Sequence, residues 1–235
     1  MRLKSALRRG VAAAVIAGIV VSSGIPAYAK TWDIASGDIT VKGASDESGN
    51  YNEVKQGNSD FERDEGETVI TSKSEESKEH TVTIDTSEGD VDVTFDDLKI
   101  DVSDKGEAAV TVKGGGDATI ELDGKNELKS GSNNAGLEKN DERFEDDEII
   151  SGKLTIKDDN GKDGSLTAEG GEGGGAGIGG GVEKTGSNIT IQGGTIEAVG
   201  GKGAAGIGDG VGARSEIDPN APPSNPSNPN HIIIS

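Results

Sequence analysis

Short runs of alternating apolar and polar residues recur through most of the chain. Apolar side chains occupy every second position at 154–156, 166–168, 189–191 and 196–198. A period of two places successive side chains on opposite faces of a β-strand, whereas a helix repeats about every 3.6 residues. The pattern therefore predicts β-strands and excludes the helical repeat folds.

Two glycine-rich blocks repeat one another. SLTAEGGEGGGAGIGGG at 165–181 is echoed by TIEAVGGKGAAGIGDG at 195–210, and Ala135-Gly136-Leu137 forms a weaker third copy. Such self-similarity is typical of stacked repeats, in which each unit covers the apolar face of its neighbour. A disordered glycine-rich linker is the alternative, but a linker has no reason to keep Ile178 and Ile207 in equivalent frames. We expect an all-β protein, a right-handed single-stranded parallel β-helix.

The first 29 residues have the features of a secretory signal peptide. A basic start precedes an apolar run at 11–21, and Ala27-Tyr28-Ala29 is a small-x-small cleavage site. A membrane anchor would need about 20 apolar residues, and Ser22-Ser23-Gly24 and Pro26 interrupt the run too soon. Secretion to the bacterial cell surface or the medium is therefore expected.

The rest of the chain is expected to divide into four parts. The apolar set changes parity between Phe95 and Leu98, which predicts a corner at Asp96-Asp97. The segment EKNDERFEDDE at 138–148 is predicted to be a charged loop that Phe144 attaches to the repeats. Residues 158–164 are predicted to form a turn, and their spacing does not match that of an EF-hand. The expected parts are N-terminal coils and their cap at 30–79, β-helix repeats at 80–212, a Pro/Asn/Ser linker or loop at 213–230, and the start of a truncated coil at 231–235.

Charge and cysteine content restrict the partners. The chain has 23 Lys and Arg against 43 Asp and Glu, and removal of the leader leaves 19 basic residues and a net charge near −24. This charge excludes nucleic acid and an anionic membrane surface as partners.

The chain has no cysteine, so stability must come from the stacked core and not from disulfides. We expect a monomer.

An acidic strip at Asp90, Asp92, Asp96 and Asp97 is the best candidate binding site. The apolar residues between the first three are expected to face inward, which places Asp90, Asp92 and Asp96 outward on one strand. Carboxylates so placed repel one another unless a cation neutralises them, and oxygen-rich sites suit Ca²⁺. The strip therefore predicts a calcium site that bridges to a uronate polymer. The alternative is a solvated acidic face that maintains solubility and blocks edge association.

Several phrases carry a resemblance to a known family. They are TIELDGKNELKSGSNNAGLEKN at 119–140, GKLTIKDDNGKDGSLTAEGG at 152–171, GAGIGGG at 175–181 and SNITIQGGTIEAVGGKGAAGIGDG at 187–210. The chain resembles the β-helical carbohydrate-binding-domain-containing surface proteins of Gram-positive anaerobic bacteria. The resemblance implies extracellular binding of polysaccharide, helped by calcium.

An enzyme is the main rival class, because parallel β-helices also host polysaccharide lyases and hydrolases. The arginines after the leader are Arg63, Arg143 and Arg214, and His80 is the histidine of the repeat region. None of them forms a recognisable catalytic group, and 43 acidic residues make no carboxylate pair distinctive. We therefore expect no catalytic residues and a polysaccharide-binding protein without catalysis. A structural stalk or adhesin and a lyase or hydrolase are the alternatives.

Overall fold

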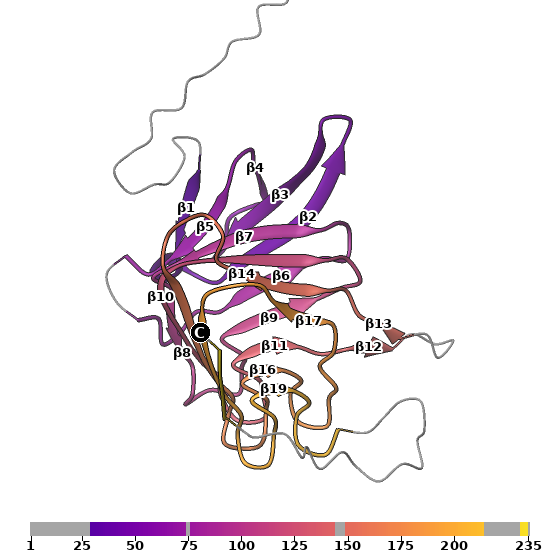
Figure 1. Ribbon diagram of the computed structural model, residues 1–235. Coiled ribbons are helices and arrows are strands. Elements are labelled where there is room, and N and C mark those ends of the chain that lie inside the picture. The colour runs from indigo at the N-terminus through magenta and orange to yellow at the C-terminus, as the bar shows by residue number, and fades with distance from the viewer. Residues whose placement is uncertain (1–28, 74–75, 144–148, 214–230, 235) are drawn as a thin grey trace, which may run out of the picture.

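The structure is a computed structural model that describes residues 29–73, 76–143, 149–213 and 231–234. The described chain is all-β, apart from a short 3-10 turn at Ile34–Ser36. Most strands pair in parallel and stack into three ladders (Figure 1). No helix in these residues is long and apolar enough to cross a membrane.

Each ladder is a column of parallel strands. The first ladder contains β1 (Lys30–Asp33), β5 (Thr68–Thr71), β7 (Val91–Asp96), the first half of β10 (Ala118–Lys129), β14 (Leu154–Lys157) and β17 (Ile189–Ile191). The second contains β8 (Lys99–Asp101), the second half of β10, β15 (Gly164–Glu169) and β18 (Thr195–Val199). The third contains β2 (Ile39–Asp46), β6 (Val82–Asp85), β9 (Val110–Lys113), β11 (Leu137–Lys139), β16 (Ile178–Gly179) and β19 (Ile207–Gly208).

From β7 onward the chain visits the three ladders in turn, and we call one such passage a layer. Corners separate the first ladder from the second within a layer. Asp97 lies between β7 and β8 with φ of 52°, and Gly124 bends β10 with φ of 61°. The corner that the parity change predicted at Asp96-Asp97 is confirmed.

Aliphatic side chains from successive layers meet in register inside the ladders. Val93 pairs with Ile120, Ile120 with Ile156, and Ile156 with Ile191. Phe95 on β7 is fully buried in the same core. Full burial of one such side chain contributes about 1.5–3 kcal/mol, so the stacked core holds the layers together.

The sequence repeat coincides with structural register. Ser165 pairs with Thr195, Leu137 with Ile178, and Ile178 with Ile207. The predicted third copy at 135–137 therefore occupies the same position in its layer as the two clear copies. The predicted inward and outward alternation is confirmed at β15 and β18, where burial changes at every residue.

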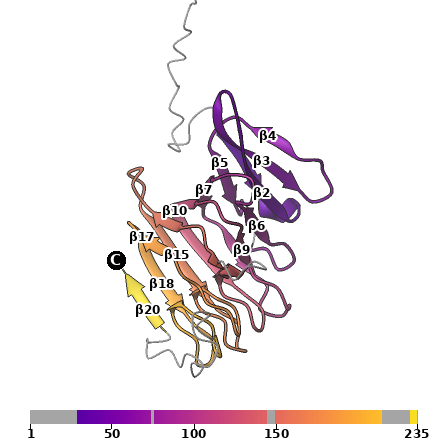
Figure 2. The same ribbon diagram turned by 90° about the vertical axis from the view of Figure 1, so that its right-hand side faces the viewer.

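Four antiparallel strand pairs depart from this pattern. They are β2–β3–β4 with β3 at Gly49–Gln56 and β4 at Glu62–Asp64, β12 (Glu142–Arg143) with β13 (Ile149–Ile150), and β18 with β20 (His231–Ile234). Figure 2 shows β3 and β4 at one end of the stack and β20 at the other. Antiparallel neighbours at a sheet end occupy backbone groups that would otherwise be free to pair with another chain.

The prediction that 231–235 begins another coil of the stack is wrong in the direction of strand pairing. β20 runs antiparallel to β18, with Ala198 opposite Ile232, and does not continue the stack in parallel. The predicted charged loop at 138–148 is also wrong at its start, because Glu138 and Lys139 belong to β11 and are buried. Phe144 and most of the predicted signal peptide and linker lie outside the described residues.

Candidate functional site

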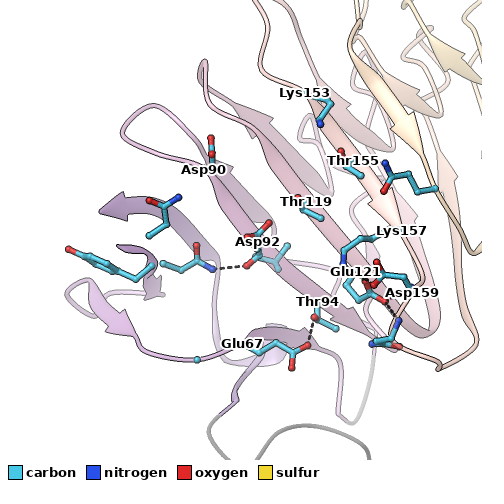
Figure 3. Close-up of a pocket in the computed structure, with 17 residues that line it drawn as sticks. Glu67, Asp90, Asp92, Thr94, Thr119, Glu121, Lys153, Thr155, Lys157 and Asp159 are labelled. Carbon is cyan, nitrogen blue, oxygen red and sulfur yellow. Dashed lines mark hydrogen bonds and ion pairs between the residues drawn. The ribbon is translucent and has the colours of Figure 1, made fainter. Parts of the chain in front are cut away.

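An open groove of about 700 Å³ crosses the outer face of the first ladder (Figure 3). Its floor is formed by β7, β10 and β14. One wall comes from β3 and the segment at 66–67, and the other from the turn at 159–160. The groove therefore brings together residues from several layers of the stack.

Parallel register arranges the floor side chains in rows. Asp92, Thr119 and Thr155 form one row across three strands, as Figure 3 shows. Thr94, Glu121 and Lys157 form the next row. Adjacent strands lie about 4.8 Å apart and alternate residues along a strand about 6.6 Å apart. The floor is thus a fixed grid of hydroxyl, carboxylate and ammonium groups.

The β3 wall is anchored to the floor by a buried amide. Asn52 Nδ2 donates to the Asp92 carbonyl oxygen at 2.7 Å and to Thr68 Oγ1 at 2.9 Å. Tyr51, the residue before Asn52, lines the groove, and the Arg63 guanidinium lies 3.7 Å from the centre of its ring. An aromatic side chain held in this way can contact the apolar face of a sugar ring.

Glu121 links the floor to the opposite wall. It is only 7 % exposed, and its Oε1 accepts hydrogen bonds from the backbone nitrogens of Asp159 and Asn160 at 3.0 and 3.2 Å. Lys157 Nζ lies 2.9 Å from Asp159 Oδ1, and this bond raises the pKa of Lys157 and lowers that of Asp159. The turn that forms this wall is therefore held by ionised side chains at neutral pH.

The sequence predicted a turn at 158–164 but did not predict this wall. Glu121 and Asp123 alternate along β10 with the core residues Ile120 and Leu122, and both are buried because the turn folds over them. Asp123 is 1 % exposed and accepts a hydrogen bond from Asn160 Nδ2 at 2.6 Å. The one available signal was the insertion itself, whose five extra residues at 159–163 are absent from the next layer.

The four predicted metal ligands do not converge on one point. Asp90 and Asp92 are exposed at the groove, whereas Asp96 is half-buried on β7 beyond it. Asp97 lies at the corner and accepts the Lys125 backbone N–H at 2.8 Å. Among the described residues, no group of three or more His, Cys, Asp or Glu side chains is arranged to hold a metal ion. The four residues do not fit a calcium ion as a set, and calcium stays a prediction.

Asp96 offers a test of the electrostatics beside the groove. Burial, followed by the nearby carboxylates of Asp123 and Asp97, raises its pKa. A raised carboxyl pKa in the folded state means that its charge destabilises the protein at neutral pH, and that this cost disappears as pH falls below the unfolded value of about 3.9.

We expect Asp96→Asn to stabilise the protein at pH 7 by about 0.5 kcal/mol after allowance for solvent screening. Urea unfolding at neutral pH and below the unfolded pKa measures this, and the gain should vanish at the lower pH. The control is Asp104→Asn, which removes one charge at an exposed position. An equal gain in both variants at neutral pH would show that net charge alone is responsible.

Of the other ionisable candidates, His80 and Arg63 are not among the residues that line the groove. His80 Nδ1 is 3.5 Å from Asp38 Oδ1, and neither residue lines the groove. Arg63 pairs with Asp46 and, at 2.8 Å, with Glu65. The side chain of Arg143 and the whole of Arg214 lie outside the described part.

Comparison with known proteins gives no relative for this arrangement. No family model matches the chain, and no curated protein or solved structure matches it. The resemblance drawn from the repeat phrases stays a prediction.

Proposed function

We propose that this protein is an exported polysaccharide-binding protein without catalysis, built as a right-handed parallel β-helix, and that the groove on the first ladder holds the glycan. The visits to the three ladders in turn support the β-helix, because each layer repeats the path of the one before. The single observation that carries the function is the open polar groove on a rigid sheet face.

The chemistry of the groove suits a sugar chain. Hydroxyls of Thr94, Thr119 and Thr155 and the amides of Asn50 and Gln192 line it together with carboxylates. Sugar hydroxyls both donate and accept hydrogen bonds, so a mixed set of this kind can satisfy them. Because the side chains stand on paired strands, little conformational entropy is lost when a ligand binds.

A steric block of the groove floor tests the proposal. Thr119 is half-buried in the middle of the floor, between Asp92 and Thr155. Thr83 is its counterpart on the third ladder, half-buried between Thr40 and Thr111 and away from the groove. We expect the mature protein to bind at least one polysaccharide on a glycan array, Thr119→Tyr to weaken this about tenfold or more by filling the groove, and Thr83→Tyr to leave it unchanged.

Three outcomes would contradict the proposal. Silence of the wild-type protein on all glycans would favour the structural stalk or adhesin. Equal loss of glycan binding in the two tyrosine variants would show that the glycan does not bind in the groove. Release of unsaturated or reducing ends from a bound polymer would identify a lyase or hydrolase. Repeating the array with a chelator tests the predicted calcium-dependent binding of uronates.

A further inference from the structure

We infer that the groove selects glycans that carry free amino groups, such as polymers of glucosamine, over neutral or uronate polymers. This inference rests on the proposed function, since it names the ligand class of the same groove. It departs from the uronate ligand predicted from the sequence. The charge of the groove lining is the starting observation.

The groove lining is net negative. Five carboxylates face two lysines among its described residues. The carboxylates belong to Glu67, Asp90, Asp92, Glu121 and Asp159, and the ammonium groups to Lys153 and Lys157. A concave site lined mainly by one sign of charge concentrates ligands of the opposite sign.

Three of the carboxylates have no cationic partner in the described structure. Glu67 accepts a hydrogen bond from Thr94 Oγ1 at 2.6 Å, and Asp90 accepts one from the Asp117 backbone N–H at 2.8 Å. Asp92 is exposed, and its neighbour in the row is the neutral Thr119. These three groups lie at the β3 side of the groove, so that side carries uncompensated negative charge.

The other side of the groove is only partly compensated. Lys157 is shared by two carboxylates, at 3.1 Å from Glu121 Oε2 and 2.9 Å from Asp159 Oδ1. Glu121 Oε2 is buried, and the cation that faces it is the Lys157 ammonium, which Asp159 shares. Lys153 is 4.0 Å from Asp117 and is drawn toward a carboxylate outside the groove. On both sides of the groove, carboxylates therefore outnumber the ammonium groups that could neutralise them.

An amino-sugar polymer supplies what the groove lacks. Each ammonium group brings a positive charge and three donors, and a charge-assisted hydrogen bond to a carboxylate is about twice as strong as a neutral one. A uronate would add negative charge to the lining, and a neutral sugar would leave it uncompensated. The rows of threonine hydroxyls and the amides favour a sugar over a basic peptide, since they match ring hydroxyls along the chain.

The test compares two oligosaccharides of equal length that differ only in N-acetylation. A glucosamine hexamer and an N-acetylglucosamine hexamer are titrated calorimetrically into the mature protein, below the pKa of the sugar amines. We expect the free-amine hexamer to bind about tenfold tighter or more, which corresponds to one or two charge-assisted hydrogen bonds. Asp92→Asn with Glu67→Gln should abolish this preference, because both changes keep size and remove charge.

Control measurements separate the groove from the overall acidity of the chain. Asp104→Asn with Glu107→Gln removes the same two charges at exposed sites away from the groove and should leave the preference intact. An equal loss in this control, or equal binding of a hexalysine peptide, would overturn the inference by showing general attraction to cations. Binding of the N-acetylated hexamer or of polygalacturonate at least as tightly as the free amine would overturn the inference and leave polysaccharide binding standing. Absence of binding to any glycan would overturn both.

Discussion

Replacing Gly171 with alanine is expected to destabilise the protein by about 3 kcal/mol or more, through overpacking of backbone against backbone. A Cβ at Gly171 would lie 2.0 Å from the carbonyl oxygen of Gly131 in the layer before. The same contact recurs at Gly201, whose Cβ would lie 2.0 Å from the Gly171 oxygen. The layers approach too closely at this corner for any side chain. Neither carbonyl can move without disturbing its own turn, where the Gly131 oxygen accepts the Asn134 backbone N–H and the Gly171 oxygen accepts that of Gly174.

Gly106→Ala is the matched control for this prediction. No atom lies within 4 Å of a Cβ at Gly106, and its φ is outside the left-handed region. Alanine there should be neutral or stabilising by up to about 1 kcal/mol, because it restricts the unfolded chain. Urea unfolding followed by circular dichroism measures both variants. Similar midpoints for the two would show that the corner glycines are not required for close stacking.

The repetitive part of the fold was predictable because its cause is local. Alternation at 189–191 and 196–198 and the repeated glycines fix which side chains face inward and where the chain bends. Stacking then follows, since equivalent positions such as Ile178 and Ile207 meet only when layers lie in register. The parity change near Phe95 specified a corner for the same reason.

The groove was not predictable because its walls come from contacts between distant segments. Asn52 and Asp92 are far apart in the sequence, and only the antiparallel pairing of β2 with β3 brings them together. The turn at 159–160 likewise reaches back to Glu121 across a whole layer. Apart from the five extra residues at 159–163, nothing in the local pattern of either segment indicates these contacts.

The acidic strip shows the limit of reading a strand from its sequence. Alternation correctly turned Asp90 and Asp92 outward, but it could not specify how far their carboxylates converge. Asp90 and Asp97 each accept a backbone N–H from the next layer, from Asp117 and Lys125. Some of the aspartate side chains therefore hold adjacent layers together, and the number of carboxylates in the sequence does not reveal this role.

The second large effect is expected at Asn126, which is fully buried on β10. Its register partner in the next layer is Leu166, so a polar residue holds an inward position that is apolar there. Asn126 Oδ1 accepts the Leu98 backbone N–H at 2.8 Å, and its Nδ2 donates to the carbonyl oxygens of Asp123 and Ser165 at 3.1 and 3.0 Å. One side chain thus joins three successive layers.

Asn126→Ala should destabilise the protein by about 3 kcal/mol, because a buried donor and two acceptors lose a partner. Asn126→Leu restores apolar volume without these bonds, and it should still cost about 2 kcal/mol, since the Leu98 N–H is left without a partner in the core. Comparing the two by urea unfolding separates packing from hydrogen bonding. A leucine variant as stable as the wild-type protein would show that the position needs only volume, and that the amide does not hold the layers together.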